Sequence, residues 1–185
     1  MTERIFTLAN QLTVLRMLLI PAFVILVVYG YFGSALAVFA FAGATDALDG
    51  LAARRAGEKT SLGAWLDPAA DKLLLVTTFV VLTLPNLGLV NRIPVWLTVL
   101  VISRDVGIVL TVAIVSLAMG PRTFKPSRLG KGATAFFIVT CVVVMYYNYL
   151  GTTSPVVDAF IWGSLAITLA SGIDYVFRLA RIINS

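Results

Sequence analysis

The amino-acid sequence contains no histidine and only one cysteine, Cys141, among its 185 residues. Without histidine, the chain lacks the usual zinc ligand and the usual general base, and it has no Ser-His-Asp triad. A lone cysteine excludes an intrachain disulfide and a cysteine metal cluster. Any catalytic chemistry is therefore expected to depend on carboxylates.

Charged residues are also scarce: they make up 12% of the chain, whereas hydrophobic residues make up 59%. Soluble domains contain about 25% charged residues, so this composition predicts an all-α integral membrane protein. Because one transmembrane helix takes about 20 residues, the length allows about six helices and leaves no room for a separate soluble domain. We therefore expect a single membrane domain over residues 1–185.

Apolar runs bounded by glycine, proline or charged residues predict six transmembrane helices. The runs lie near residues 12–32, 35–45 with a polar extension, 68–84, 94–118, 132–150 and 156–177. Ahead of them, residues 1–9 place Ile5, Phe6 and Leu8 beside Glu3 and Arg4. This pattern predicts a short interfacial helix rather than a signal peptide.

Basic residues are divided unequally between the two sets of helix ends. One set carries Arg4, Arg16, Arg54, Arg55, Lys59, Lys72, Arg122, Lys125, Arg128, Lys131, Arg178 and Arg181. The opposite loops, residues 30–34, 85–94 and 151–155, contain only Arg92. By the positive-inside rule, both termini and the basic connections 57–66 and 120–130 are expected in the cytoplasm. The net charge of +5 then indicates contact with anionic headgroups rather than with nucleic acid.

Of the nine acidic residues, four aspartates lie between positions 46 and 71, within or beside apolar segments. They are Asp46, Asp49, Asp67 and Asp71. A charged residue at the centre of a membrane helix costs about 2.5–3.5 kcal/mol on insertion scales. A group of four therefore indicates a compensating partner such as a metal ion.

The spacing of these aspartates predicts two helical faces that carry carboxylates. The first pair is separated by three residues and the second by four, and each spacing puts both side chains on one side of a helix. The short connection between the helices, residues 55–66, would bring the two faces together. Carboxylate oxygens without cysteine or histidine favour Mg²⁺ or Mn²⁺, and two such ions can hold a diphosphate.

Structural explanations of the same residues are also open. Asp67 precedes Pro68 and could cap a helix, and either Asp46 or Asp49 alone could pair with an arginine. The small residues Gly50, Ala53 and Gly63 could serve helix packing. A single cap does not explain the other three carboxylates.

The segment from Asp46 to Asp71 resembles the signature of the CDP-alcohol phosphatidyltransferases, D-x2-D-G-x2-A-R-x8-G-x3-D-x3-D, at all eight fixed positions. The resemblance implies six transmembrane helices, a homodimer, and transfer of a phosphatidyl group from CDP-diacylglycerol to an alcohol with release of CMP. It implies that Asp46, Asp49 and Asp67 bind one Mg²⁺, and that Asp71 binds a second and is the general base. The implied CDP-binding residues are Thr13, Asp49, Gly50, Ala53, Arg54 and Gly63.

A second group of basic residues predicts the acceptor site. The segment Ser103-Arg104-Asp105 lies inside the fourth expected helix, and the segment from Lys125 to Lys131, which includes Ser127 and Arg128, precedes the fifth. We expect Arg104, Lys125, Arg128 and Lys131 to bind a phosphate on the acceptor, which favours an anionic acceptor over ethanolamine, choline or serine. Alternatively, Arg104 and Asp105 form a structural ion pair.

Two kinds of enzyme in this family fit an anionic acceptor. Bacterial phosphatidylglycerophosphate synthases, which use glycerol 3-phosphate, resemble the chain in length, in Asn10 to Arg16, in Gly130-Lys131 with Thr134, and in the segment 171–175. They usually carry Arg-Glu where this chain has Arg104-Asp105. Cardiolipin synthases, which accept phosphatidylglycerol, resemble it in Ile-Ser-Arg-Asp and Lys-Pro-Ser. We expect glycerol 3-phosphate as acceptor, in the bacterial inner membrane with the active site facing the cytoplasm.

Proteins of other classes also combine apolar helices with buried aspartates. A small cation transporter would show inverted halves or helices interrupted near the midplane, and the sequence shows neither. A polyprenyl transferase would need more helices and another aspartate spacing. Binding of a cytidine nucleotide with Mg²⁺ would separate these classes.

Overall fold

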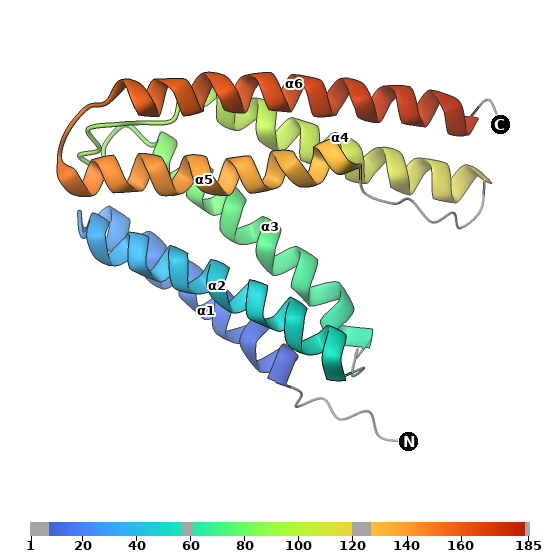
Figure 1. Ribbon diagram of the computed structural model, residues 1–185, viewed down its shortest axis with the longest axis horizontal. Helices are drawn as coiled ribbons and strands as arrows, with labels where there is room; N and C mark the ends of the chain where they lie inside the picture. Colours follow the sequence, from blue (N-terminus) through green and yellow to red (C-terminus); the bar gives the residue numbers. More distant parts are fainter. Residues whose placement is uncertain (1–7, 57–60, 120–126, 184–185) are drawn as a thin grey trace. The chain divides into compact units, whose positions relative to one another are not determined.

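The computed structural model describes residues 8–56, 61–119 and 127–183. Within these ranges, the side chains of residues 8–10, 12, 46–56, 61–69, 71, 116, 118–119 and 181–183 are not described. The chain forms the helices α1 (Leu8–Val28), α2 (Phe32–Ala56), α3 (Ser61–Thr83), α4 (Val95–Met119), α5 (Arg128–Leu150) and α6 (Pro155–Ile183) (Figure 1). The described ranges contain no strand. The prediction of an all-α chain with six helices is confirmed, whereas the expected interfacial helix falls largely outside these residues.

Helices α2 and α3 extend further toward each other than the apolar runs indicated. Helix α2 continues through the polar extension to Ala56, and α3 begins at Ser61 rather than near residue 68. Asp67 and Pro68 therefore lie inside α3, so the explanation of Asp67 as an N-terminal cap is wrong. A helix can continue through aspartate and small residues because its backbone hydrogen bonds do not depend on apolar side chains.

Glycine ends two of the helices in the same way. Gly30 after α1 and Gly151 after α5 have φ of 77° and 67°. The backbone N–H groups of Gly30 and Tyr31 donate to the carbonyls of Val27 and Leu26. This is a Schellman motif, in which a left-handed residue lets the chain satisfy the last carbonyls of a helix. Gly151 and the residue after it repeat the pattern at the end of α5.

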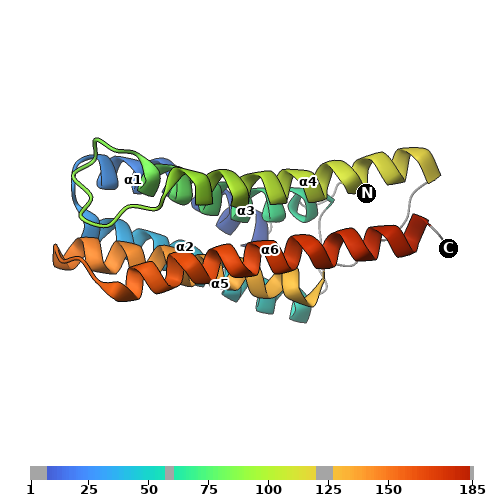
Figure 2. The same ribbon diagram turned by 90° about the horizontal axis from the view of Figure 1, so that it is seen from above.

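The chain divides into two compact units, and the first consists of residues 1–92 and 144–152. In it, α1 packs against both α2 and α3 (Figures 1 and 2). The core includes Phe23, Phe39 and Phe79, all 3% exposed or less, and the rings of Phe23 and Phe39 lie 6.0 Å apart. The last turn of α5 belongs to this unit, where the aromatic ring of Tyr149 lies over Gly33 of α2.

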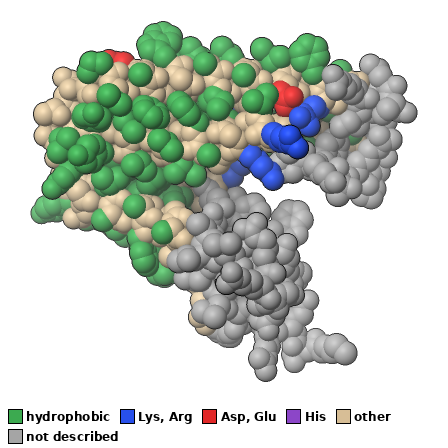
Figure 3. All heavy atoms as spheres, viewed as in Figure 1, with side chains coloured by type: hydrophobic (Ala, Val, Ile, Leu, Met, Phe, Trp, Pro, Cys, Tyr) green, Lys and Arg blue, Asp and Glu red, His purple; other side chains and the backbone are tan. Residues whose placement is uncertain are grey.

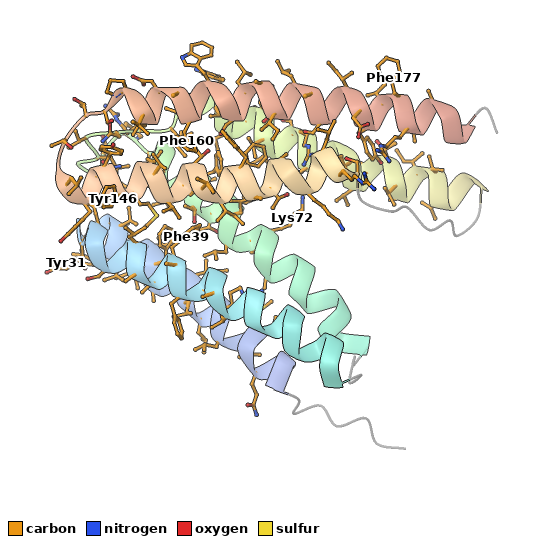
Figure 4. The ribbon with its side chains drawn as sticks, viewed as in Figure 1. Tyr31, Phe39, Lys72, Tyr146, Phe160 and Phe177 are labelled. Atoms are coloured by element: carbon orange, nitrogen blue, oxygen red, sulfur yellow. The ribbon has the colours of Figure 1, made fainter. Side chains whose placement is uncertain are left out.

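The second unit consists of residues 93–143 and 153–185. Here α4 packs against α6, and the indole rings of Trp96 and Trp162 lie 5.9 Å apart. Phe160 of α6 stacks on Phe136 of α5 at 5.3 Å (Figure 4). A buried contact of 2.9 Å joins the hydroxyls of Thr140 and Ser164 between α5 and α6. Since apolar lipid drives helix association weakly, such hydroxyl contacts and close packing hold membrane helices together.

Among the described residues, three helices contain segments long and apolar enough to cross a membrane: Val95–Val115, Arg128–Leu150 and Pro155–Ala180. The apolar parts of the other helices within the described residues are shorter, namely Thr13–Val28, Phe32–Thr45 and Lys72–Thr83. Hydrophobic side chains cover much of the face seen in Figure 3, and Leu117 is 88% exposed. An outer surface of this kind is expected where the surrounding medium is lipid.

A buried pair of asparagines fixes the connection between α3 and α4 to the end of α5. The Asn91 N–H donates to Oδ1 of Asn148 at 3.0 Å, and Nδ2 of Asn148 donates to the Asn91 carbonyl at 2.8 Å. The same Nδ2 donates to the Val144 carbonyl, and Nδ2 of Asn91 donates to the Thr152 carbonyl. One side chain thus satisfies both backbone groups of Asn91.

We expect Asn148→Ala to lower the thermal unfolding temperature of the protein in detergent, because it leaves the backbone N–H and carbonyl of Asn91 without partners. Each buried group left without a hydrogen bond costs about 1–3 kcal/mol. The control is Asn86→Ala, since Asn86 is exposed in the same connection. Equal unfolding temperatures for the two variants would contradict a stabilising role for the pair.

Candidate active site

The signature residues occupy the facing ends of two consecutive helices. Asp46, Asp49, Gly50, Ala53 and Arg54 lie in α2, and Gly63, Asp67 and Asp71 lie in α3. Because both segments are helical, each aspartate pair lies on one side of its helix, as the spacing predicted. The side chains of these eight residues lie outside the described set. The oxygen donors fit a hard divalent ion such as Mg²⁺ by their chemistry.

Helix α1 packs against both helices that carry the aspartates. Thr13 and Arg16, one helical turn apart on α1, are 0% and 1% exposed. Thr45 and Ala70, the residues before Asp46 and Asp71, are also buried. The acidic residues of this unit are the four signature aspartates, Glu3 and Glu58. Arg16 therefore adds a buried positive charge to the unit that contains all four aspartates.

Among the described side chains, no group of three or more acidic or cysteine residues is placed to hold a metal ion. The four signature aspartates are outside that set, so the metal site remains a prediction from the sequence. The expected ligands are Asp46, Asp49, Asp67 and Asp71.

The second unit contains the ion pair between Arg104 and Asp105, which the sequence analysis gave as an alternative to phosphate binding. Nη1 of Arg104 donates to Oδ1 of Asp105 at 2.7 Å, and the two side chains are 9% and 11% exposed. Nε of Arg104 is also buried, but it has no hydrogen-bond partner among the described residues. The ion pair is therefore confirmed, and it uses only part of the donor capacity of Arg104.

The start of α5 lies close to this arginine. The Gly130 N–H donates to Oγ of Ser127 at 2.8 Å, which caps the helix. A Cβ atom at position 130 would lie 3.4 Å from Nη2 of Arg104, so the first turn of α5 lies next to this side chain. Arg128 and Lys131 are exposed in the first turn of α5.

Three of the four predicted acceptor residues are therefore on two elements that meet in one unit: Arg104, Arg128 and Lys131. Lys125 lies outside the described residues. The sequence prediction missed the contribution of Ser127 as a cap and of Gly130 as the point of contact. A serine just before a predicted helix is a recognised cap signal, whereas the contact with Arg104 has no local signal.

Helix α6 is joined to α4 by a hydrogen bond one turn beyond Arg104. The Tyr175 hydroxyl donates to the Ile108 carbonyl of α4 at 3.1 Å. One helical turn apart on the exposed side of α6, Nε of Arg178 donates to Oδ2 of Asp174 at 2.9 Å. The middle of α4, one turn beyond Arg104, is thus held from α6 by a hydrogen bond to the backbone.

Four aspartates suited to a divalent ion, in a chain with long apolar helices, fit an enzyme that acts on a phosphorylated substrate in a membrane. The family model for CDP-alcohol phosphatidyltransferase matches residues 6–170. The chain belongs to the CDP-alcohol phosphatidyltransferase family. It is an enzyme of phospholipid synthesis and, by its family and its apolar helices, a membrane protein.

Similar proteins carry two different names. A protein of Mycobacterium tuberculosis (strain H37Rv), named a probable phosphatidylglycerophosphate synthase, is 32% identical over 98% of this chain and 85% of its own length. A cardiolipin synthase (CMP-forming) of Streptomyces coelicolor is 29% identical over 100% and 87% of the two chains. The cardiolipin synthase (CMP-forming) of Homo sapiens is 33% identical over 97% of this chain and 63% of its own. These relatives therefore carry the names of two different synthases of one family.

Proposed function

We propose that the enzyme transfers the phosphatidyl group of CDP-diacylglycerol to glycerol 3-phosphate, giving phosphatidylglycerophosphate and CMP. The observation that carries the choice of acceptor is the charge of the cluster formed by Arg104, Asp105, Arg128 and Lys131. Three cations and one carboxylate leave two positive charges. This matches the dianionic phosphomonoester of glycerol 3-phosphate, whereas the phosphodiester of phosphatidylglycerol carries one negative charge. Arginine and lysine at a helix start are suited to phosphate binding.

In the proposed reaction, Asp46, Asp49 and Asp67 hold one Mg²⁺ and Asp71 holds a second. Bound Mg²⁺, or Mn²⁺ in its place, would neutralise the diphosphate and the departing CMP. Asp71 accepts the proton of the acceptor hydroxyl, whose oxygen forms the new bond to phosphorus as the bond to CMP breaks. Thr13, Asp49, Gly50, Ala53, Arg54 and Gly63 would bind the CDP moiety.

The arrangement in the membrane is part of the same proposal. If all six helices cross the bilayer, an even number of spans puts both termini on one side, and the basic connections make that side the cytoplasm. The enzyme would then act at the cytoplasmic face of a bacterial inner membrane, as a homodimer with one membrane domain over residues 1–185. The family supports this topology, as do the three long apolar helices and the shorter apolar segments of the other three.

Cardiolipin synthesis from phosphatidylglycerol is the second candidate, favoured by the names of two relatives. The deciding experiment supplies purified protein with CDP-diacylglycerol and either glycerol 3-phosphate or phosphatidylglycerol, and identifies the lipid product by mass spectrometry. Phosphatidylglycerophosphate supports the proposal. Cardiolipin as the sole product would replace it.

We expect Lys131→Gln to raise the KM for glycerol 3-phosphate about tenfold while leaving the KM for CDP-diacylglycerol nearly unchanged. A charge-assisted hydrogen bond to phosphate contributes about 1.5–3 kcal/mol, and exposure of Lys131 places the effect toward the lower end. Steady-state kinetics with each substrate varied in turn measures both constants. Arg92→Gln, an exposed cation in the connection between α3 and α4, is the matched control. An equal rise in both constants would contradict a local role for Lys131.

A further inference from the structure

The nitrogens of the Arg104 guanidinium are engaged unequally. Nη1 donates to Asp105, whereas Nε is buried and has no partner in the part of the chain that the structure describes. In arginine, Nε and Nη2 present two parallel N–H groups, and this edge can bind one phosphate with two hydrogen bonds. Asp105 therefore accepts a hydrogen bond from Nη1, which takes no part in this two-point contact.

The open edge lies beside the first turn of α5. Nη2 would be 3.4 Å from a Cβ atom at position 130, and that position follows Ser127 and Arg128 closely in the chain. The Arg104 side chain is only 9% exposed, so water has little access to satisfy Nε. A buried N–H group without a partner is costly, and an oxyanion seated between Arg104 and the start of α5 would remove that cost.

We propose that Asp105 is a positioning residue, which holds Arg104 so that its Nε–Nη2 edge faces an acceptor phosphate at the start of α5. This inference rests on the proposed function, because it takes the acceptor site to be the cationic cluster. The Asp105 carboxylate fixes the plane of the guanidinium from the adjacent position on α4. The oxyanion chemistry is shared by glycerol 3-phosphate and phosphatidylglycerol.

Positioning and simple electrostatics predict effects of opposite sign for Asp105→Asn. The amide removes a negative charge next to the phosphate site, so electrostatics alone would tighten binding of the anionic acceptor. Positioning predicts the reverse, because the neutral amide holds the guanidinium less firmly than a charge-assisted hydrogen bond does. The sign of the change in KM therefore distinguishes the two.

The test uses the full-length enzyme in lipid–detergent micelles, with glycerol 3-phosphate and phosphatidylglycerol as separate acceptors. For Asp105→Asn, we expect the KM for the acceptor to rise about tenfold, with kcat and the KM for CDP-diacylglycerol changed less than about twofold. Asp105→Glu retains the charge and is expected to stay near wild type. Asp174→Asn, which removes the same charge from the exposed pair on α6, is the control and should have no effect.

A double-mutant cycle with Arg104→Lys tests whether Asp105 acts through Arg104. Lysine lacks the two-point edge, so Asp105→Asn should add little to the higher KM of Arg104→Lys. A lower KM for Asp105→Asn, or fully additive effects, would overturn the positioning role. If Asp105→Asn does not fold, the pair Asp105→Glu and Asp105→Gln makes the same comparison at equal side-chain length.

The outcomes also separate this inference from the proposed function. If Arg104→Lys leaves the KM for both acceptors unchanged, the cationic cluster is not the acceptor site and both proposals fail. If Arg104→Lys raises the KM but Asp105→Asn does not, only the positioning role fails. If only phosphatidylglycerol is used as acceptor, and Asp105→Asn raises its KM without adding to the effect of Arg104→Lys, the positioning role stands and cardiolipin synthesis replaces the proposed reaction.

Discussion

The variant Asp71→Asn is expected to retain its fold and lose its transferase activity. The amide has nearly the volume of the carboxylate but does not accept the proton of the acceptor hydroxyl, and it is a weaker ligand for a divalent ion. General-base catalysis alone contributes about 10²–10⁴-fold to a rate. We therefore expect turnover to fall at least a thousandfold, measured as CMP released from CDP-diacylglycerol in the presence of glycerol 3-phosphate.

The matched control is Asp158→Asn, which removes a carboxylate from the exposed first turn of α6. It should retain wild-type turnover, because Asp158 is not part of the aspartate signature. Size-exclusion chromatography and thermal unfolding in detergent check that both variants fold. Turnover of Asp71→Asn within about tenfold of wild type would remove Asp71 from the role of general base.

Removal of divalent metal is expected to abolish turnover. Four carboxylates at the facing ends of two consecutive helices repel one another when ionised, and a divalent ion offsets that repulsion. After treatment with EDTA and desalting, activity should return with Mg²⁺ or Mn²⁺. Ca²⁺ should restore it poorly, since Ca²⁺ prefers more ligands at longer distances than Mg²⁺ does.

A measurement without turnover makes the metal prediction independent of the choice of acceptor. Mg²⁺ together with a cytidine nucleotide should raise the unfolding temperature of the wild-type protein, because a ligand that binds only the folded state stabilises it. Asp46→Asn should show a smaller rise. Full turnover after EDTA treatment, or an equal rise in the variant, would count against a metal site formed by the aspartates.

The helices could be predicted from sequence because their signal is local. Runs such as 94–118 and 132–150 are long, apolar and bounded by glycine, proline or charge, and both correspond closely to α4 and α5. The ends of α2 and α3 were less predictable. There the apolar pattern stops before the helix does, and aspartate beside proline looked like a helix start although it lies inside α3.

The candidate site likewise has a part that the sequence predicts and a part that it does not. The aspartate pairs follow from spacing within a single helix, so a linear pattern is enough to find them. The contact between Arg104 and the turn at Gly130 joins residues from separate helices, and it depends on how α4 and α5 pack. The Asn91–Asn148 pair likewise joins residues 57 positions apart. A polar residue in an apolar run indicates that a partner exists but does not identify it.

The position of the single cysteine makes the chain convenient for chemical mapping. Cys141 is fully buried in α5, so its thiol is shielded from a polar maleimide in the folded protein. A cysteine introduced at an exposed position such as Tyr31, Thr152 or Lys131 would be the main accessible thiol, without prior removal of a native one. Membrane-impermeant maleimides applied to intact cells and to inverted vesicles would then assign each helix end to one side of the bilayer.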